Sequence, residues 1–271
     1  MRKLNLTTMP EEERATFYQA FRYPPFKIYK DITRSVEISS VEEWFEYCPP
    51  AKGRKQWVDM RSAKEMAKFW TDTRKQNDFL LSLQKVSKDL TFSHAFPEMA
   101  TKFDDFRRPR INDLCVYALE GNKQVLISIE GKADEPFGNY VYQEWAVSIK
   151  RKITKSSSKG IDRLIGLYER FDKKAIFLKL RYQLTYWLAG VIDEAERNKI
   201  DTVFLIVQEF HSKDTAEKKR KINEQDLNCF VNFISRSDFE NVNKNEIVGP
   251  IKNQFTKHIN LYIGKYQTYL D

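Results

Sequence analysis

Residues 110–132 read RINDLCVYALEGNKQVLISIEGK, and this stretch decides the fold that the sequence predicts. It contains two apolar runs, 114–119 and 125–129, with Gly121 and Asn122 between them. Both of these residue types tolerate the positive φ angles that a two-residue hairpin turn requires. We therefore expect two antiparallel strands joined by a tight turn.

The expected turn also fixes which residues lie opposite each other. Its register places Asp113 opposite Glu130, with Cβ atoms about 4.5–5.5 Å apart. Lys132 follows Glu130 by two residues, so it lies on the same face of the strand. Two carboxylates held opposite each other repel unless a positive charge separates them. We interpret the three residues as a site for a divalent cation; the alternative is a strand end that carries solvated charges.

An aspartate, a hairpin and then Glu-x-Lys is similar to the metal site of the PD-(D/E)XK nuclease superfamily. Asn112 stands where a proline often precedes the aspartate, and this departure removes no ligand. The chain also resembles an uncharacterised bacterial family within that superfamily over roughly residues 57–240. The resemblance rests on Asn112-Asp113, EGKADEPFG at 130–138, Glu144-Trp145, RYQL at 181–184 and the strand-like run 203–210.

The resemblance implies a restriction-endonuclease-like α/β fold with a mixed central β-sheet flanked by helices. The order of a hairpin, a long helix and a buried strand favours the same class. The resemblance further implies a nuclease in which Asp113, Glu130 and the carbonyl of Gly131 hold Mg²⁺ or Mn²⁺. Lys132 would orient the attacking water or stabilise developing negative charge. Its alternative role is an ion pair with Asp113 or Glu130 in a metal-free protein.

Two further acids and one amide are candidate members of this site. Glu65 and Glu98 are candidates for a third acidic ligand, which the superfamily often takes from an early helix. Glu65 has an alternative role, because Ser62-x-x-Glu65 has the spacing of a helix capping box. Gln183 lies on the apolar stripe of a predicted helix and points inward, where a polar group needs a partner. Related nucleases carry a glutamine near the metal; the alternative for Gln183 is a structural hydrogen bond to the sheet.

The rest of the chain reads as helices, strands and loops without an internal repeat or a separable linker. We expect residues 1–56 to form a helical and extended segment packed on the core, and residues 57–271 to form the nuclease-like domain. Helices are predicted at 10–21, 42–47, 62–74, 139–149, 162–171, 176–198 and 224–234, and strands at 202–207 and 259–266. Loops are predicted at 94–110, 150–160 and 213–221.

The formal net charge of +8 and the pI near 9.2 favour a polyanionic partner. We expect this partner to be nucleic acid, and DNA in particular. The candidate phosphate contacts in the predicted loop are Lys150, Arg151, Lys152, Lys155 and Lys159. The alternative is that these cations are only solvated. No recognition helix or zinc finger is evident, so the sequence predicts no base specificity, and it leaves a homodimer open.

Composition and spacing argue against several other classes. Cys48, Cys115 and Cys229 are widely spaced, which favours a reducing compartment and argues against structural zinc. The sequence has no signal-peptide core and no apolar run of roughly 18 residues, so we expect a cytoplasmic protein without a membrane span. The three histidines form no metal-binding pair, and no glycine-rich phosphate loop is present.

Three functions compete on the sequence alone. The first is a metal-dependent nuclease, and the second is a nuclease-fold protein that binds nucleic acid or a protein partner without cleaving. The third is a structural module whose aromatic N-terminal residues serve an interface. These residues are Phe17, Tyr18, Phe21, Tyr23, Phe26 and Tyr29. The intact set of Asp113, Glu130 and Lys132 favours the first function, because an inactive descendant has no reason to keep all three.

Overall fold

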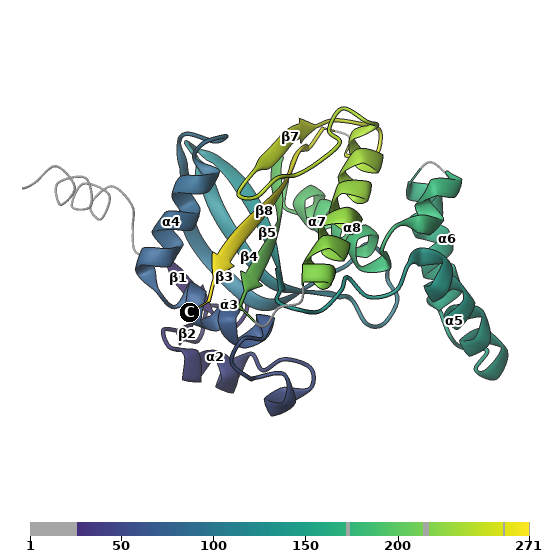
Figure 1. Ribbon diagram of the computed structural model, residues 1–271, viewed down its shortest axis with the longest axis horizontal. Coiled ribbons are helices and arrows are strands. Elements are labelled where there is room, and N and C mark those ends of the chain that lie inside the picture. The colour runs from purple at the N-terminus through teal and green to yellow at the C-terminus, as the bar shows by residue number, and fades with distance from the viewer. Residues whose placement is uncertain (1–25, 172–173, 214–216, 257, 271) are drawn as a thin grey trace, which may run out of the picture.

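The computed structural model describes residues 26–171, 174–213, 217–256 and 258–270. These residues form an eight-stranded β-sheet with helices on both faces (Figure 1). The strands lie in the order β2-β1-β3-β4-β5-β6-β8-β7. Their bounds are β1 Lys27–Tyr29, β2 Glu37–Ile38, β3 Leu90–Thr101, β4 Arg110–Glu120, β5 Lys123–Lys132, β6 Thr202–His211, β7 Ile247–Ile251 and β8 Asn260–Tyr269. Parallel and antiparallel neighbours both occur, so the predicted α/β class with a mixed sheet flanked by helices is confirmed.

The helices enclose two apolar cores, one on each face of the sheet. The first core lies under α2 (Val41–Tyr47), α3 (Ser62–Trp70) and α4 (Thr73–Leu83). The second lies under α7 (Tyr182–Arg197) and α8 (Glu217–Ser235). Two further helices, α5 (Val141–Thr154) and α6 (Gly160–Arg170), extend to one side of the sheet (Figure 1). Short 3-10 helices lie at Gly53–Lys55 and Ala175–Lys179.

The predicted hairpin is present as β4 and β5. Its register runs from Glu120 opposite Lys123 at the turn to Leu114 opposite Ile129. Gly121 has a φ of 58°, a conformation that glycine adopts without steric cost. β5 lies between β4 and β6 in the middle of the sheet, and all of its residues from 125 to 132 are buried. The local turn sequence therefore fixed the register on which the candidate site depends.

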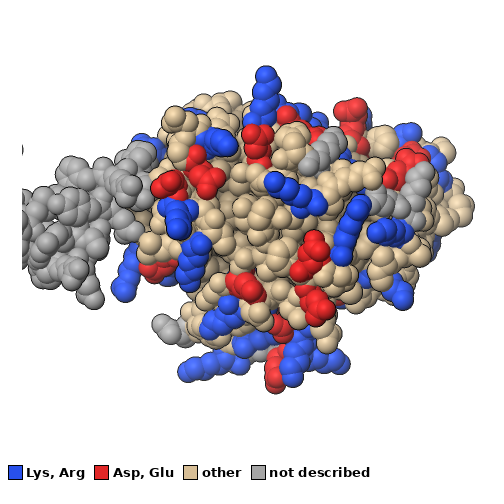
Figure 2. All heavy atoms as spheres, turned by 90° about the horizontal axis from the view of Figure 1, so that it is seen from above, with Lys and Arg blue, Asp and Glu red and all other residues tan. Residues whose placement is uncertain are grey.

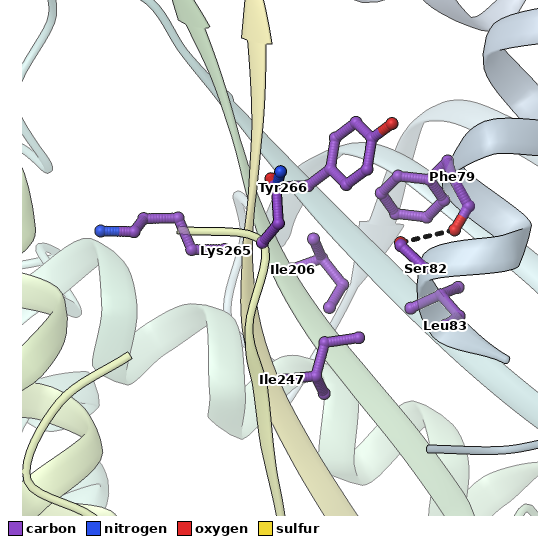
Figure 3. Close-up of a pocket in the computed structure, with 8 residues that line it drawn as sticks. Phe79, Ser82, Leu83, Ile206, Ile247, Lys265 and Tyr266 are labelled. Atoms are coloured by element: carbon purple, nitrogen blue, oxygen red, sulfur yellow. Dashed lines mark hydrogen bonds between the residues drawn. The ribbon is translucent and has the colours of Figure 1, made fainter. Parts of the chain in front are cut away.

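Alternation along β8 shows how the sheet separates its two faces. The ring of Tyr266 packs 4.8 Å from that of Phe79 on α4, between ring centres. Lys265 points to the other face, where its Nζ donates to Oε1 of Glu224 on α8 at 3.0 Å (Figure 3). The mostly apolar pocket beside Tyr266 contains none of the residues predicted for the functional site.

The predicted loop at 94–110 is wrong for residues 94–101, because β3 continues to Thr101 and pairs with β4 along the way, whereas residues 102–109 are neither helix nor strand, as predicted. On its other side β3 meets β1, and that pairing ends at Ala95. Pro97 therefore lies where β3 has a free edge, and sheets tolerate proline at such edges. The prolines and charges of this segment led to the prediction of a loop. The free edge at which a strand tolerates them depends on tertiary structure, which the sequence does not show.

Two predicted helices have different ends in the structure. The helix that starts at Ser62 stops at Trp70 rather than near residue 74, because Asp72 caps a new helix by accepting from the backbone N–H of Arg74. The helix predicted at 176–198 is divided into a 3-10 turn and α7, which starts at Tyr182. The predicted helix at 42–47 and the predicted strands at 202–207 and 259–266 are confirmed, and both strands run longer than expected.

Both predicted basic loops are shorter than expected. α5 continues to Thr154, so Lys150, Arg151 and Lys152 are helical, and α8 starts at Glu217 rather than near residue 224. Lysine and arginine are good helix formers, and a run of them on an exposed face does not end a helix. The high charge of these segments was wrongly interpreted as a sign of loops.

The predicted helix at 10–21 and the aromatic residues Phe17 to Tyr23 lie outside the described residues. Phe26 packs into the first core, with its ring 5.3 Å from that of Phe92 between centres. The division of the chain at residue 56 stays a prediction, and β1 and β2 join the central sheet through β3. Among the described helices, none is long and apolar enough to cross a membrane.

Candidate functional site

The predicted site lies where the two hairpin strands separate. The ladder between β4 and β5 ends at Leu114 and Ile129, whereas β5 stays paired with β6 as far as Lys132. In the opening, Oδ2 of Asp113 accepts a hydrogen bond from the backbone N–H of Gly131 at 2.7 Å. A cavity of about 350 Å³ adjoins this point, and we call it the carboxylate cavity. Its charged lining residues are Glu98, Arg110, Asp113, Glu130, Lys132 and Glu135.

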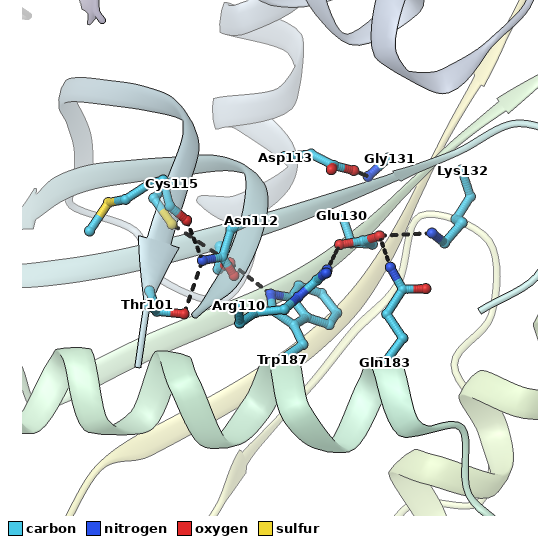
Figure 4. A network of polar contacts seen from close by, with 12 residues as sticks. Thr101, Arg110, Asn112, Asp113, Cys115, Glu130, Gly131, Lys132, Gln183 and Trp187 are labelled. Atoms are coloured by element: carbon cyan, nitrogen blue, oxygen red, sulfur yellow. Dashed lines mark hydrogen bonds and ion pairs between the residues drawn. The ribbon is translucent and has the colours of Figure 1, made fainter. Parts of the chain in front are cut away.

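Glu130 is the most deeply buried carboxylate of the cavity (Figure 4). Its Oε2 pairs with Arg110, and its Oε1 accepts from Lys132 Nζ at 2.7 Å and from the amide of Gln183. Burial raises the pKa of Glu130, but the charges and hydrogen bonds of Arg110 and Lys132 outweigh burial, so the pKa lies below its ordinary value. Glu130 is therefore a charged carboxylate with both oxygens engaged.

Asp113 and Glu98 show the opposite behaviour. Burial, and then the nearby charge of Glu130, raises the pKa of Asp113 to about 7. Burial, followed by the charges of Asp113 and Glu130, raises the pKa of Glu98 to about 8. The cavity thus holds more carboxylates than its own cations neutralise. In the absence of another cation, protons supply part of the missing positive charge.

The three acids come from corresponding positions on three adjacent strands. Glu98 lies between two pairs of the β3–β4 ladder, Pro97 with Leu114 and Met99 with Asn112, which places it opposite Asp113. Asp113 lies one position beyond the pair that ends the β4–β5 ladder, which places it opposite Glu130. Glu98 also has a φ of 49°. Such a left-handed conformation is strained in a non-glycine residue and concentrates at functional sites.

Asn112 holds the strand that carries Asp113. Its Nδ2 donates to the carbonyl of Met99 at 2.8 Å and to Thr101 Oγ1 at 3.0 Å, both on β3. Its Oδ1 accepts from Ser128 Oγ on β5 at 3.2 Å, and Ser128 in turn accepts from Trp187 on α7 at 2.7 Å (Figure 4). Asn112 therefore connects three strands and, through Ser128, one helix.

Of the two predicted third acids, Glu98 lines the carboxylate cavity and Glu65 is not among the residues that line it. Glu65 is buried on α3, where it accepts from the backbone N–H of Met60 at 3.0 Å and from Lys68 at 2.8 Å. The predicted capping by Ser62 is wrong, because the N-cap is Arg61 and Ser62 instead donates to Glu135. Glu135, which was not predicted, lines the cavity and holds the turn after β5.

One part of the cavity wall is largely apolar and comes from residues 44–66. Its members include Trp44, Pro50, Trp57 and Met66. The side chain of Trp44 is buried, whereas Trp57 is partly exposed and packs 5.0 Å from Phe45 between ring centres. Nothing in the spacing of these residues indicates that they meet the hairpin. The sequence predicted only the helix at 42–47.

A second cavity, of about 900 Å³, lies beside the first, and we call it the basic cavity. Its cations are Arg107, Arg108, Arg151, Lys155, Lys159 and Arg163, and its acids are Asp105 and Glu144. The two cavities are lined by neighbouring residues, since Arg108 and Arg110 flank Pro109, and Tyr182 precedes Gln183. Figure 2 shows that positive and negative side chains are interspersed on the face seen from above.

The predicted phosphate contacts fall into two groups. Arg151, Lys155 and Lys159 line the basic cavity, whereas Lys150 and Lys152 are not among its lining residues. Sequence reasoning missed Arg107, Arg108 and Arg163, which come from the segment after β3 and from α6. Arg163 pairs with Asp104 at 2.7 Å and donates to the carbonyls of Arg107 and Arg108, so it shapes this segment. Within the described residues, the side chains of Arg107, Arg108 and Lys155 form no ion pair.

The donor set of the carboxylate cavity suits a hard cation that keeps several waters. Within the described part of the chain, no three Asp, Glu, His or Cys side chains form a group that would hold a metal ion unaided. Magnesium commonly binds through one or two carboxylates and keeps water as its remaining ligands. Asp113 and Glu130, with the backbone of Gly131, supply that smaller set. The excess of carboxylates over cations gives the site a reason to take up positive charge.

The family model described as Domain of unknown function (DUF6946) matches residues 37–269. The chain belongs to this family. The match includes both cavities and their described lining residues. The comparisons with curated proteins and with solved structures found no match.

Proposed function

We propose that the protein is a metal-dependent nuclease of the PD-(D/E)XK type with a restriction-endonuclease-like core, and that it hydrolyses phosphodiester bonds in nucleic acid, DNA in particular. One observation carries the proposal: Glu98, Asp113 and Glu130 lie at corresponding positions of three adjacent strands and line one cavity together with Lys132. Carboxylates in such a cluster repel one another unless a cation joins them. The basic cavity next to it supports a polyanionic substrate.

The residues would divide the chemistry among them. Asp113, Glu130 and the carbonyl of Gly131 would hold Mg²⁺ or Mn²⁺, which when bound would neutralise charge on a phosphate and lower the pKa of a water. Lys132 would orient that water or stabilise the negative charge that develops on the phosphate. Gln183 would keep Glu130 in position through its amide hydrogen bond. Hydrolysis adds the water oxygen to phosphorus, breaks one P–O ester bond and leaves a protonated hydroxyl.

A second candidate function is a nuclease-fold protein that binds nucleic acid or a protein partner without cleaving. The observation that favours it is the engagement of both oxygens of Glu130 by Arg110, Lys132 and Gln183. An ion pair between Lys132 and Glu130 is also the role expected of Lys132 in a metal-free protein. The two functions differ in whether a metal ion displaces these partners.

The test is to incubate the full chain with Mg²⁺ or Mn²⁺ and a panel of labelled DNA and RNA. We expect cleavage that EDTA stops and that Lys132→Ala reduces by about 100- to 1000-fold, the effect of removing one stabilising donor. Lys88→Ala is the matched control, since Lys88 is exposed and is not among the residues lining either cavity. Cleavage that survives in both Asp113→Asn and Lys132→Ala would move the activity elsewhere. Binding without any cleavage would favour the second function.

A further inference from the structure

The carboxylate cavity has two unlike walls, and their chemistry matches the two parts of a nucleotide. The sheet side carries Asp113, Glu130 and Lys132, which suit a phosphate and its cation. The part of the lining that comes from residues 44–66 carries Trp57 and Pro50, which suit an aromatic base. We infer that the cavity receives one nucleotide with an unpaired base, so that the substrate is single-stranded nucleic acid or a single-stranded region. This inference rests on the proposed function and narrows its substrate class.

The size of the cavity supports a single unpaired nucleotide. A volume of about 350 Å³ lies near the lower end of the roughly 300–1,000 Å³ that enclose small ligands. A stretch of duplex does not fit into such a space. Within a duplex, each base is stacked on its neighbours and paired, so its face is not available to Trp57. Stacking on Trp57 therefore requires a base that is already unpaired or that leaves its duplex.

The basic cavity repeats the same combination of charge and aromatic surface. Phe106 and Tyr182 line it together with Arg107, Arg108 and Lys155. Grooves that bind single strands combine cations for the backbone with aromatic rings on which successive bases stack. Because neighbouring residues line the two cavities, a strand with its scissile phosphate at Asp113 can continue from one into the other. A second set of stacking and phosphate-binding groups would then lie along the path of that strand.

The experiment measures cleavage of one sequence in three forms, with Mg²⁺ and the full chain. The forms are a single strand, its blunt duplex and the duplex with one mismatched base, each as DNA and as RNA. Trp57→Ala and Trp57→Phe are compared with Trp145→Ala. Trp145 is the matched control because it lies on α5 in a separate apolar groove and is not among the residues lining either cavity.

Binding is measured in the Lys132→Ala background, so that the substrate stays intact. There we expect Trp57→Ala to weaken single-strand binding by about 5- to 150-fold, the value of one stacked base. Trp57→Phe should weaken single-strand binding less than Trp57→Ala does, and Trp145→Ala should leave binding unchanged. A strand that lacks the base at the cleavage position should remove the penalty of Trp57→Ala, because the two groups form one contact. If Trp57→Ala fails to fold, Trp57→Phe and the abasic strand still give the answer.

The outcomes separate the inference from the function on which it rests. Single strands cut at least about tenfold faster than the blunt duplex, with mismatched duplex in between, would support the inference. A blunt duplex cut as fast as the single strand would overturn it and leave the nuclease in place. If the losses of binding free energy caused by Trp57→Ala and by the abasic strand add when both are present, the inference would also be overturned. If the unmodified protein cuts no form of DNA or RNA, the proposed function itself fails.

Discussion

Arg110 and Glu130 form an ion pair inside the carboxylate cavity. Glu130 is also one of the ligands of the proposed metal site. The side chain of Glu130 is 3% exposed and that of Arg110 15%, and Nε of Arg110 is among the buried polar atoms without a partner in the described residues. Breaking a buried pair by removing one partner is costly, because it leaves an uncompensated charge. Arg110 therefore supplies charge to Glu130 in the metal-free protein, and a metal ion on Glu130 would compete with it.

Arg110→Gln should consequently have two opposite effects. In EDTA it should lower the free energy of unfolding by about 3–5 kcal/mol, the cost of leaving a buried carboxylate without its partner. In excess Mg²⁺ or Mn²⁺ much of this loss should be recovered, and calorimetry should show tighter metal binding than in the unmodified protein. Urea denaturation with and without metal measures the first effect.

The matched control for this prediction is Arg61→Gln. Arg61 also pairs with a carboxylate, Asp134, but its side chain is 53% exposed. Exposed pairs contribute about 0–1 kcal/mol, and metal should not change the effect of this variant. If the loss of stability and its response to metal are the same in Arg110→Gln as in Arg61→Gln, then the positive charge of Arg110 does not take the place of a metal ion.

Stability without metal should depend on pH in a direction set by Asp113 and Glu98. Both groups ionise near pH 4 in an unfolded chain, and their folded pKa values lie at about 7 and about 8. Between these limits the folded protein binds more protons than the unfolded chain, so the free energy of unfolding falls as pH rises. His94 acts oppositely at lower pH, since burial, and then the charge of Arg34, lowers its pKa to about 4. Between about pH 6.5 and about 8, the pH dependence of stability therefore reports on the two carboxylates and not on His94.

The measurement is urea denaturation in EDTA across that window. Glu98→Gln and Asp113→Asn should each flatten the fall in stability, because neither amide can ionise. Metal affinity should rise with pH over the same window, since the metal displaces protons from the carboxylates. Stability that does not fall with pH across this window would show that the carboxylates are charged without metal, and that the cavity needs no added cation.

Asn112→Ala should weaken both the fold and the site. The change removes two donated hydrogen bonds and one accepted bond at a fully buried position. Leaving such groups unpaired costs about 1–3 kcal/mol for each, so the urea midpoint should fall clearly. Metal affinity should fall as well, because the backbone next to Asp113 loses its anchor to β3. Asn198→Ala, which removes an exposed amide bonded to Glu194, should have little effect on either quantity.

The parts of the site that the sequence predicted are those encoded by local chemistry. The Gly121-Asn122 turn sets the hairpin register, which places Asp113 opposite Glu130, and the apolar stripe of α7 turns Gln183 inward to reach Glu130. That Glu98 and not Glu65 lines the carboxylate cavity was not predictable, because it depends on β3 pairing with β4 through a segment interpreted as loop. The partner of Arg110 and the wall that contains Trp57 arise from tertiary contacts, for which the spacing of residues gives no signal.

The last prediction separates the cations of the basic cavity from those that are only near it in sequence. Replacing Arg107, Arg108 and Lys155 by serine should weaken nucleic-acid binding and flatten its dependence on salt. The slope of log affinity against log salt should change by about 0.7 for each lost contact with a single strand, or about 0.9 with a duplex. Cleavage at saturating substrate should survive, because these residues contribute equally to binding the ground state and the transition state.

Lys150→Ser is the matched control, because Lys150 lies on α5 beside Arg151 but is not among the residues lining the cavity. It removes one positive charge, as Arg108→Ser alone does, so any effect of net charge alone would appear in both single variants. Lys132→Ala should show the reverse pattern, with binding nearly intact and turnover lost. If Lys150→Ser changes the salt slope as much as Arg108→Ser does, then phosphates respond to the overall charge of this face. The basic cavity would then not be the path of the strand.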